Sequence, residues 1–293
     1  DKKGLSLKGE VKTGRTHLMY AMPIDFSQEL SGWSAQLKTA EKGIILAAKE
    51  IALLPQGGTA IGTGINAHKD FGKIFTSEVQ KLSKLNVKTS SNYFKSLSAQ
   101  DSAAQLSSSV KNLSLVLTKI SNDLRWMNSG PLTGLGEIEL EALQPGSSIM
   151  PGKVNPVIPE AVAMACADVI GNDLTVSIAS QSGNFQLNVM LPVIAYNLLK
   201  SISLMSNSMP LLANKAIKSF KVNKKNIAQS LGMNPILVTA LNREIGYEKA
   251  AKIAKKAYKE KRPIIDVANE ETGLPVAKLK ALLNPAKLTK GGV

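Results

Sequence analysis

Three runs of apolar side chains recur at alternating steps of three and four residues, and this spacing limits the fold more than any other feature of the sequence. The runs cover residues 25–54, 103–127 and 191–212. Such steps bring apolar side chains onto one face of an α-helix, and the heptad-like repeat favours side-by-side packing of long helices. The sequence therefore predicts an all-α fold built on a bundle of long helices.

Local signals support the first of these helices. Asp25, followed three residues later by Gln28, is a variant of the capping box that starts helices, and Pro55 with the glycines at 57 and 58 ends the segment. Residues 161–170 are apolar almost all round, which is typical of a helix at the centre of a bundle. No comparable alternation with the period of a β-strand is present in the sequence.

The pattern changes after about Lys221. Short helical segments separated by glycines and prolines follow, and basic residues concentrate there. We therefore expect residues 1–221 to form a central long-helix bundle domain and residues 222–293 to form a small helical C-terminal domain. Helices of the length predicted for the first domain usually pack against neighbours in the same chain or in other subunits, so a homo-oligomer is expected.

The formal net charge of +14 favours anionic partners. Aromatic residues make up only 4% of the chain and are not interleaved with the basic runs, so the sequence lacks the stacking platform that nucleic-acid binders use. We therefore expect no nucleic-acid partner. The charge is interpreted as steering small anions toward the protein and keeping it soluble.

Three further features describe the setting of the chain. Its most apolar stretch, residues 189–199, is interrupted by Pro192 and Asn197, so no membrane span of about 20 residues is expected. Cys166 is the only cysteine, which excludes an internal disulfide framework and fits a reducing, cytoplasmic compartment. Asp1 is not followed by a basic segment and then an apolar one, so we expect the start to be a cut in a longer chain rather than a signal peptide.

Residues 57–67 are rich in glycine and contain a G-x-G-x-x-A pattern. In a dinucleotide-binding protein this pattern follows a strand within a βαβ unit. Here a long helix is predicted before it and no parallel sheet is expected. We therefore interpret the segment as a loop between helices and expect no nucleotide cofactor.

The strongest functional signal is the segment of residues 146–156, GSSIMPGKVNP. Its glycines and prolines predict a loop, and its serines, Lys153 and Asn155 make that loop polar. The loop leads into a helix predicted from about Pro156, whose first N–H groups favour a carboxylate or the oxyanion of an enolate-like intermediate. A solvated loop between helices is the alternative interpretation, but the length of the motif argues against it.

Only two histidines are available to move protons near neutral pH. His17 lies in the segment GRTH, residues 14–17, which we expect to be an exposed loop before the first long helix, although a structural histidine is about as common there. His68 is assigned no role. One cysteine and two histidines cannot form a closed thiolate or histidine site with four ligands, so no metal and no other cofactor is expected.

Residues 146–156 resemble the signature of the fumarase/aspartase superfamily. Gly152 is the residue typical of class II fumarases, where aspartases usually carry alanine, and His17 is typical of fumarases, where aspartases usually carry glutamine. Segments at 123–131, 182–189 and 237–247 extend the resemblance over essentially the whole chain. The resemblance implies the C-terminal two-thirds of a metal-free lyase that interconverts fumarate and malate as a homotetramer.

The resemblance also implies roles for the residues of the polar loop. Ser147 matches the base that takes the proton from carbon 3 of malate and leaves an aci-carboxylate intermediate, and Ser148 is its neighbour in the substrate-binding loop. Lys153 and Asn155 match residues that hold a substrate carboxylate. Serine is a poor base by itself, so it would need donors from the loop backbone and Lys153 to lower its pKa.

A second set of roles comes from a different part of the chain. Thr16 and His17 match a segment that reaches the same pocket, and Glu160 matches a carboxylate that pairs with this histidine. Such a carboxylate would orient the imidazole and favour its charged form while a water is positioned or protonated at carbon 2.

Departures from the family leave alternatives open. Met19 and Tyr20 stand where glutamine and aspartate are usual, Lys95 stands where an acid is usual, and the family's N-terminal domain has no counterpart in the sequence. A family site combines segments of three subunits, so a pocket built from this chain would lack one wall. An aspartase or argininosuccinate lyase, or a non-catalytic scaffold with the same bundle, remain alternatives, although His17 together with Gly152 favours a fumarase.

Overall fold

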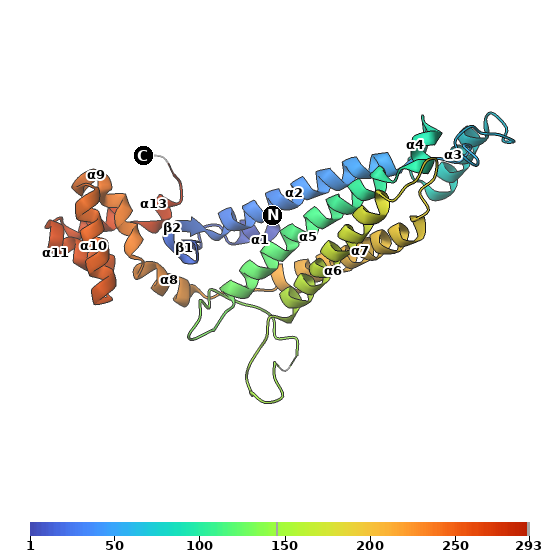
Figure 1. Ribbon diagram of the computed structural model, residues 1–293. Helices are drawn as coiled ribbons and strands as arrows, with labels where there is room; N and C mark the ends of the chain where they lie inside the picture. The colour runs from blue at the N-terminus through green and yellow to red at the C-terminus, as the bar shows by residue number, and fades with distance from the viewer. Residues whose placement is uncertain (145, 292–293) are drawn as a thin grey trace. The chain divides into compact units, whose positions relative to one another are not determined.

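The computed structural model describes residues 1–144 and 146–291, and these residues are mostly helical, which confirms the predicted fold class (Figure 1). They form two compact units, which we name the hairpin unit and the bundle unit. The hairpin unit contains Asp1–Ser34, Trp126–Glu141 and Ile217–Val293, and the bundle unit contains Ala35–Arg125 and Ala142–Ala216. The division of the sequence after residue 221 remains a prediction.

Four long helices run side by side in the bundle unit (Figure 1). They are α2 (Phe26–Ile51), α5 (Asp101–Met127), α6 (Val157–Ser180) and α7 (Leu191–Leu212), of which α2 begins and α5 ends in the hairpin unit. The same unit contains the helices α3 (Phe71–Ser83) and α4 (Tyr93–Ser98), the strands β3 (Leu53–Leu54) and β4 (Lys88–Thr89), and most of a π-helical turn, η1 (Ala213–Ile217). Strands β3 and β4 pair in parallel.

The apolar run predicted for residues 103–127 corresponds closely to the buried face of α5. All eight of its members are less than a tenth exposed: Ala103, Leu106, Val110, Leu113, Leu117, Ile120, Leu124 and Met127. The first run is also helical, but α2 ends at Ile51 instead of continuing to Leu54. The chain leaves the helix there because Pro55 disfavours helical backbone before it, and the carbonyls of Ala52 and Leu54 accept bonds from the segment of β4.

The third predicted run does not match the buried face of α7 at several positions. Its members are Leu191, Ala195, Leu198, Ile202, Met205, Met209 and Leu212. The buried face contains Ile194, Leu198, Met205 and Leu212 together with the polar residues Asn197, Ser201 and Ser208. Leu191 and Met209, which were expected to be buried, are 44% and 37% exposed. Because α7 is apolar on nearly every side, periodicity alone does not distinguish the face that packs in this chain.

Residues 161–170, which lie within α6, were expected to be at the centre of the bundle, and this expectation is wrong for the chain by itself. Met164 is 67% exposed and Ile170 39% exposed. Among the described residues α6 is the one helix long and apolar enough to cross a membrane by length and composition, which was not expected, and a third of its most apolar window is buried. Two of its acids are paired with neighbouring helices: Asp173 lies 2.6 Å from Lys111 of α5 and Asp168 lies 2.8 Å from Lys200 of α7.

The hairpin unit combines short helices with two antiparallel strand pairs. Its strands are β1 (Val11–Thr16), β2 (Met19–Asp25), β5 (Ile138–Glu139) and β6 (Lys221–Val222), which pair as β1 with β2 and β5 with β6. Its helices are α1 (Lys2–Ser6), α8 (Lys224–Gly232), the 3₁₀-helix η2 (Pro235–Leu241), α9 (Asn242–Ile245), α10 (Tyr247–Glu260), α11 (Ile264–Thr272), α12 (Val276–Leu282) and α13 (Pro285–Leu288). The C-terminal helices enclose a core that includes Leu241, Ile253, Val267 and Leu279.

The hairpin of β1 and β2 was not predicted from the sequence, which was read as a loop there. Its pairing runs from Val11 opposite Asp25 to Thr16 opposite Met19, with an irregularity between Thr13 and Arg15. This irregularity, the glycine at 14 and the proline at 23 interrupt the period-two pattern by which strands are recognised.

The capping box at the start of α2 is confirmed. The Asp25 carboxylate accepts hydrogen bonds from the N–H of Ser27 at 2.7 Å and of Gly9 at 2.6 Å, while the side chain of Gln28 accepts from the N–H of Asp25 at 3.0 Å. Burial by itself raises the pKa of Asp25, but the bonds from Ser27 and Gly9 outweigh it and hold the pKa below its ordinary value.

Replacing Asp25 with alanine should lower the free energy of unfolding by about 1 kcal/mol, because α2 loses its cap. Since folding lowers the pKa of Asp25, its charged form stabilises the protein at neutral pH, and this contribution is lost as the pH falls through the lowered pKa. The difference between wild type and Asp25→Ala in urea unfolding should therefore shrink below about pH 3.9, the value for a free aspartate. Glu41→Ala, at an exposed position of α2, is the control; an Asp25 effect no larger than the Glu41 effect would contradict the capping role.

Candidate active site

His17 lies at the tip of a tight hairpin turn. Because Thr16 pairs with Met19, the turn consists of His17 and Leu18 alone, and both have left-handed backbones with φ of 53° and 60°. Residues with a Cβ adopt this conformation at a cost, and such strained positions cluster at functional sites. Thr16 and His17 are both exposed, so the turn presents them to solvent.

Gly14 brings the two strands of the hairpin unusually close behind this turn. A Cβ at this position would lie 2.4 Å from the carbonyl oxygen of Met22, which is closer than any side chain allows. The glycine therefore permits the irregular pairing between Thr13 and Arg15. This local bend sets the direction in which the strand carries Thr16 and His17.

The polar loop of residues 146–156 is closed by contacts between its two ends. The side-chain amide of Asn155 donates to the carbonyl of Gly146 at 2.7 Å. A Cβ at Gly146 would lie 1.6 Å from the carbonyl oxygen of Lys153, so only glycine permits this approach. Gly152 has a left-handed backbone with φ of 83°, which also favours glycine. The first residue before this loop, Pro145, lies outside the described residues.

Ser147 is held by the backbone of its own loop. Its Oγ accepts hydrogen bonds from the N–H groups of Ile149 at 3.2 Å and Met150 at 3.1 Å. Two donors directed at a hydroxyl oxygen stabilise negative charge on that oxygen, which is the electrostatic requirement for a serine that acts as a base. Ser147 is half-buried, whereas Ser148 and Lys153 are exposed.

Glu160 lies in the first turn of α6, directly after the polar loop, and is half-buried. The helix begins at Val157, close to the predicted start near Pro156. Its 24 residues give a full helix dipole, so the loop adjoins a positive helix end. The bundle unit thus brings five predicted site residues into one loop and the helix start that follows it: Ser147, Ser148, Lys153, Asn155 and Glu160.

The two remaining predicted site residues belong to the hairpin unit. Thr16 and His17 are carried there by β1 and its turn, and the pairing of His17 with Glu160 stays a prediction.

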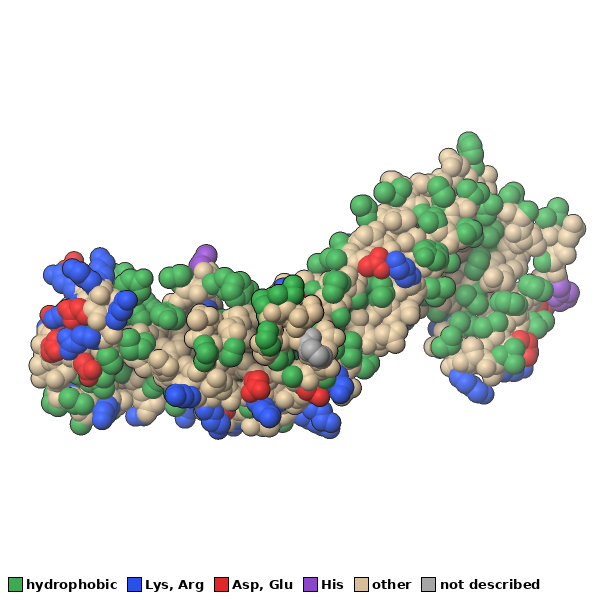
Figure 2. All heavy atoms as spheres, turned by 90° about the horizontal axis from the view of Figure 1, so that it is seen from below, with side chains coloured by type: hydrophobic (Ala, Val, Ile, Leu, Met, Phe, Trp, Pro, Cys, Tyr) green, Lys and Arg blue, Asp and Glu red, His purple; other side chains and the backbone are tan. Residues whose placement is uncertain are grey.

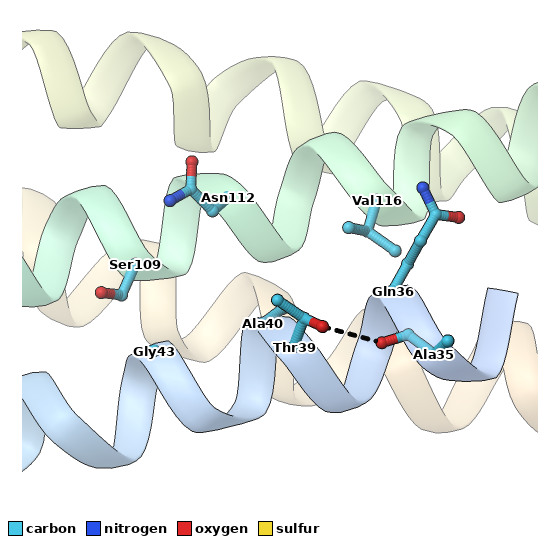
Figure 3. A pocket seen from close by; sticks show the side chains of 8 residues that line it. All are labelled: Ala35, Gln36, Thr39, Ala40, Gly43, Ser109, Asn112 and Val116. Carbon is cyan, nitrogen blue, oxygen red and sulfur yellow. Dashed lines mark hydrogen bonds between the residues drawn. The ribbon is translucent and has the colours of Figure 1, made fainter. Parts of the chain in front are cut away.

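Two hollows in the bundle unit lie away from these residues. One has a volume of about 470 Å³ and lies between α2 and α5 (Figure 3); its lining is Ala35, Gln36, Thr39, Ala40, Gly43, Ser109, Asn112 and Val116. The other, of about 250 Å³, is lined by the family departure Lys95 and by residues of β3 and of the segments near 90 and 100. None of the seven predicted site residues lines either of these two hollows; Thr16, His17, Ser148 and Lys153 are exposed, and Ser147, Asn155 and Glu160 are half-buried.

The sequence reasoning missed a set of buried charges beneath the hairpin. Lys12 and Glu137 are 4% and 1% exposed, and they form an ion pair of 2.7 Å. A lysine and a glutamate separated by more than a hundred residues give no local signal of such a pair. The strand itself gives no such signal, because Lys12 and its neighbour Thr13 are both buried and the burial of β1 does not alternate.

The sequence pattern of a lyase family matches residues 2–171, and that of the fumarase C C-terminus matches residues 237–290. The chain belongs to this lyase family. Among curated members it is 59% identical over 283 residues to fumarate hydratase class II 2 of Pseudomonas aeruginosa, covering 97% of this chain and 62% of the relative. It is 42% identical to fumarate hydratase class II of Bacillus subtilis, over 99% of this chain and 63% of the relative.

Solved structures of lyase-family members have the same fold. The class II fumarase of Schistosoma mansoni superposes with a TM-score of 0.92 at 34% identity, over 98% of this chain and 63% of that chain. Fumarate lyase:delta crystallin of Brucella melitensis, in a crystal structure bound to cobalt, superposes with a TM-score of 0.93 at 38% identity over 98% and 62%. The present chain therefore spans less than two-thirds of the length of these lyases.

Within the described residues of this chain, no three side chains of histidine, cysteine, aspartate or glutamate are grouped as metal ligands. Cys166 is fully buried on α6, and burial raises the pKa of its thiol, while a hydrogen bond with Thr118 acts in the opposite direction. A buried thiol with a raised pKa is a poor nucleophile, so Cys166 is not a candidate for the chemistry.

The close approach at Gly146 leads to a prediction for the loop. Gly146→Ala should force the loop ends apart, because the added Cβ would collide with the Lys153 carbonyl, and trypsin should then cut the exposed Lys153–Val154 bond faster. The measurement is the initial rate of that cleavage by mass spectrometry, with helix content followed by circular dichroism. Gly171→Ala on α6, where an added Cβ meets no atom within 4 Å, is the control. Equal cleavage rates in both variants would show that the loop tolerates the separation.

Proposed function

We propose that this chain carries the base and a carboxylate-binding part of a fumarate hydratase, which adds water to fumarate to give (S)-malate and catalyses the reverse reaction. The observation that carries the proposal is the environment of Ser147. Its Oγ accepts hydrogen bonds from two backbone N–H groups, in a loop next to the start of a long helix. The similarity to class II fumarate hydratases over nearly the whole chain supports the substrate class.

In the dehydration direction, Ser147 Oγ takes the proton from carbon 3 of malate. The electron pair of the broken C–H bond moves into the adjacent carboxylate and gives an aci-carboxylate intermediate. The hydroxyl group on carbon 2 then leaves as water when it receives a proton. The N–H groups of Ile149 and Met150 stabilise the deprotonated serine oxygen and so increase the fraction of the protein in which Ser147 is ready to take the proton.

The rest of the loop binds the substrate in this proposal. The exposed Lys153 supplies a positive charge for a carboxylate, and Ser148 supplies a hydroxyl group beside it. Asn155 holds the loop closed through Gly146, in addition to its predicted contact with the carboxylate. A fixed loop keeps these groups in register around a small dianion, which provides much of the advantage of an enzyme over solution.

Thr16 and His17 form a second part of the site in the proposal, with Glu160 as the carboxylate that orients the imidazole. A protonated imidazole can donate the proton that the hydroxyl group on carbon 2 receives when it leaves as water. The exposure of the hairpin tip supports this role, because Thr16 and His17 are free to enter a pocket completed by other segments.

We propose further that the complete enzyme is a cytoplasmic homotetramer and that this chain alone carries an incomplete site. Helix α6 exposes Met164, Leu174 and Ile178 (52%) without an apolar neighbour to cover them, which favours packing against other subunits. Hydrophobic side chains are spread over much of the face seen in Figure 2. More than a third of the length of the relatives has no counterpart in the match.

The role of Ser147 can be tested in a complemented enzyme, which we define as this chain joined to the segment of the Pseudomonas aeruginosa relative that lies outside the match. Ser147→Ala should reduce malate dehydration by a factor on the order of 10³, while circular dichroism stays unchanged. Ser182→Ala is the control, since this serine lies in the turn after α6 and its hydroxyl bonds only Ile178 among its described neighbours. Dehydration by Ser147→Ala within about threefold of wild type, roughly 0.6 kcal/mol, would refute the assignment.

The pairing of His17 with Glu160 can be tested by a double-mutant cycle on turnover. His17→Asn and Glu160→Gln should each reduce turnover, and the double variant should be little worse than the more damaging single variant, because a pair acts as one unit. Strictly additive losses would show that the two residues act independently.

Turnover by the complemented enzyme should survive exhaustive chelation, because the loop and Lys153 supply the positive charge that a metal would otherwise bring. Initial rates with and without chelator provide the measurement. A loss of rate that is reversed by added iron, zinc or cobalt would contradict the proposal.

A further inference from the structure

Two cations of β1 and two anions form a network in which Lys12 and Glu137 are buried and Arg15 and Glu29 are half-buried. Lys12 Nζ lies 2.9 Å from Glu29 Oε2 and 2.7 Å from Glu137 Oε2, and Arg15 pairs with the other carboxylate oxygen of Glu137. The side chains of Lys12, Arg15 and Glu137 are 5%, 13% and 1% exposed. All four residues belong to the hairpin unit, and their formal charges cancel.

Glu137 is the fixed point of this network. Its backbone N–H donates to the carbonyl of Met127 at 2.7 Å, at the end of α5, and its own carbonyl accepts from the N–H of Asn223 at 2.8 Å, next to β6. The side chain of Glu137 therefore extends from a backbone position whose N–H and carbonyl groups are both hydrogen-bonded. Lys12 is held from a third direction, with its ammonium 5.0 Å from the centre of the Phe26 ring at the start of α2.

Stability alone is a weak reason for burying these charges. Desolvation of a buried ion pair offsets most of the attraction, and well-packed apolar side chains of similar volume often stabilise a protein as well or better. An ion pair of fixed geometry can instead hold the segment that carries it in one conformation. Here that segment is β1, because Lys12 and Arg15 are both in this strand.

The hairpin tip has few means of holding itself in place. Its two turn residues have strained left-handed backbones, and both Thr16 and His17 are exposed. Behind the tip, Gly14 interrupts the regular pairing with β2. Arg15 directly precedes Thr16, and its side chain forms an ion pair with the buried Glu137.

We propose that Glu137, by binding Arg15 and Lys12 together, is a positioning residue that fixes the orientation of the Thr16–His17 turn. The inference rests on the proposed function for the benefit to catalysis, but not for the order of the turn itself. Glu137 touches no substrate in this account. Its effect reaches the reaction through Arg15 and the strand that leads to Thr16.

The test uses a variant that keeps the charges balanced, because removing Glu137 alone would leave two buried cations with one partner and could prevent folding. In the double variant Arg15→Met with Glu137→Leu, the Lys12–Glu29 pair of 2.9 Å remains. This protein should fold with the same helix content. Arg15→Lys, which keeps a cation near Glu137, is the conservative variant, and Glu244→Gln, in the exposed pair with Lys278, is the control.

The first readout is the order of the turn, measured without substrate on this chain. The chain has only two histidines, so selectively labelled histidine gives one set of NMR ring signals for His17 and one for His68. In the double variant the His17 signals should broaden or split while the His68 signals stay unchanged. Arg15→Lys and Glu244→Gln should leave both sets as in wild type. Single, unshifted His17 signals in a folded double variant would overturn the proposal.

The second readout is turnover by the complemented enzyme. The double variant should lose at least about tenfold in kcat with a smaller change in KM, because misplaced groups lower the rate of the chemical step, whereas the single variant Arg15→Lys should keep most of the wild-type kcat. A kcat within about threefold of wild type, together with unchanged His17 signals, would overturn the proposal. Disordered His17 signals with unchanged turnover would support the positioning role and count against the place of this turn in the active site.

Discussion

The packing of α5 is the constraint on which the bundle unit depends. Eight apolar side chains on one face of this helix are buried, and burial of side chains of this size contributes about 1.5–3 kcal/mol for each large one. The same helix places Ser107 and Lys111 against Asp173 of α6, with distances of 2.7 Å and 2.6 Å. An apolar face and a charged contact thus fix α6 relative to α5, and the start of α6 is where the polar loop with Ser147 is anchored.

The predictable part of the fold was the part encoded by local periodicity. The run of α5 and the cap formed by Asp25 and Gln28 could be read from the sequence because each depends on residues within a few turns of one another. The buried face of α7 could not, because apolar residues on all sides leave packing partners to decide which face is covered. The hairpin was missed because Gly14 and Pro23 interrupt the alternation of its strands.

The candidate site shows the same limit. A contiguous motif identified Ser147, Lys153 and Asn155. The structure adds why the motif needs its glycines: Gly146 has no Cβ to collide with the carbonyl of Lys153, and Gly152 has a left-handed backbone. Contacts between distant parts of the sequence are not marked by any local motif. Glu137 meets Lys12 and Arg15 across more than a hundred residues, so only the folded chain reveals what holds the turn with His17.

In the proposed function, this chain holds the base and loop of a hydratase site that other segments must complete. The most direct measurement compares the isolated chain with the complemented enzyme by the change in fumarate absorbance, after circular dichroism and sizing have shown that both are folded and oligomeric. The account predicts no turnover by the isolated chain and substantial turnover after complementation, since loss of one wall removes carboxylate ligands and admits water. Robust turnover by the isolated chain, or none by a folded complemented enzyme, would contradict it.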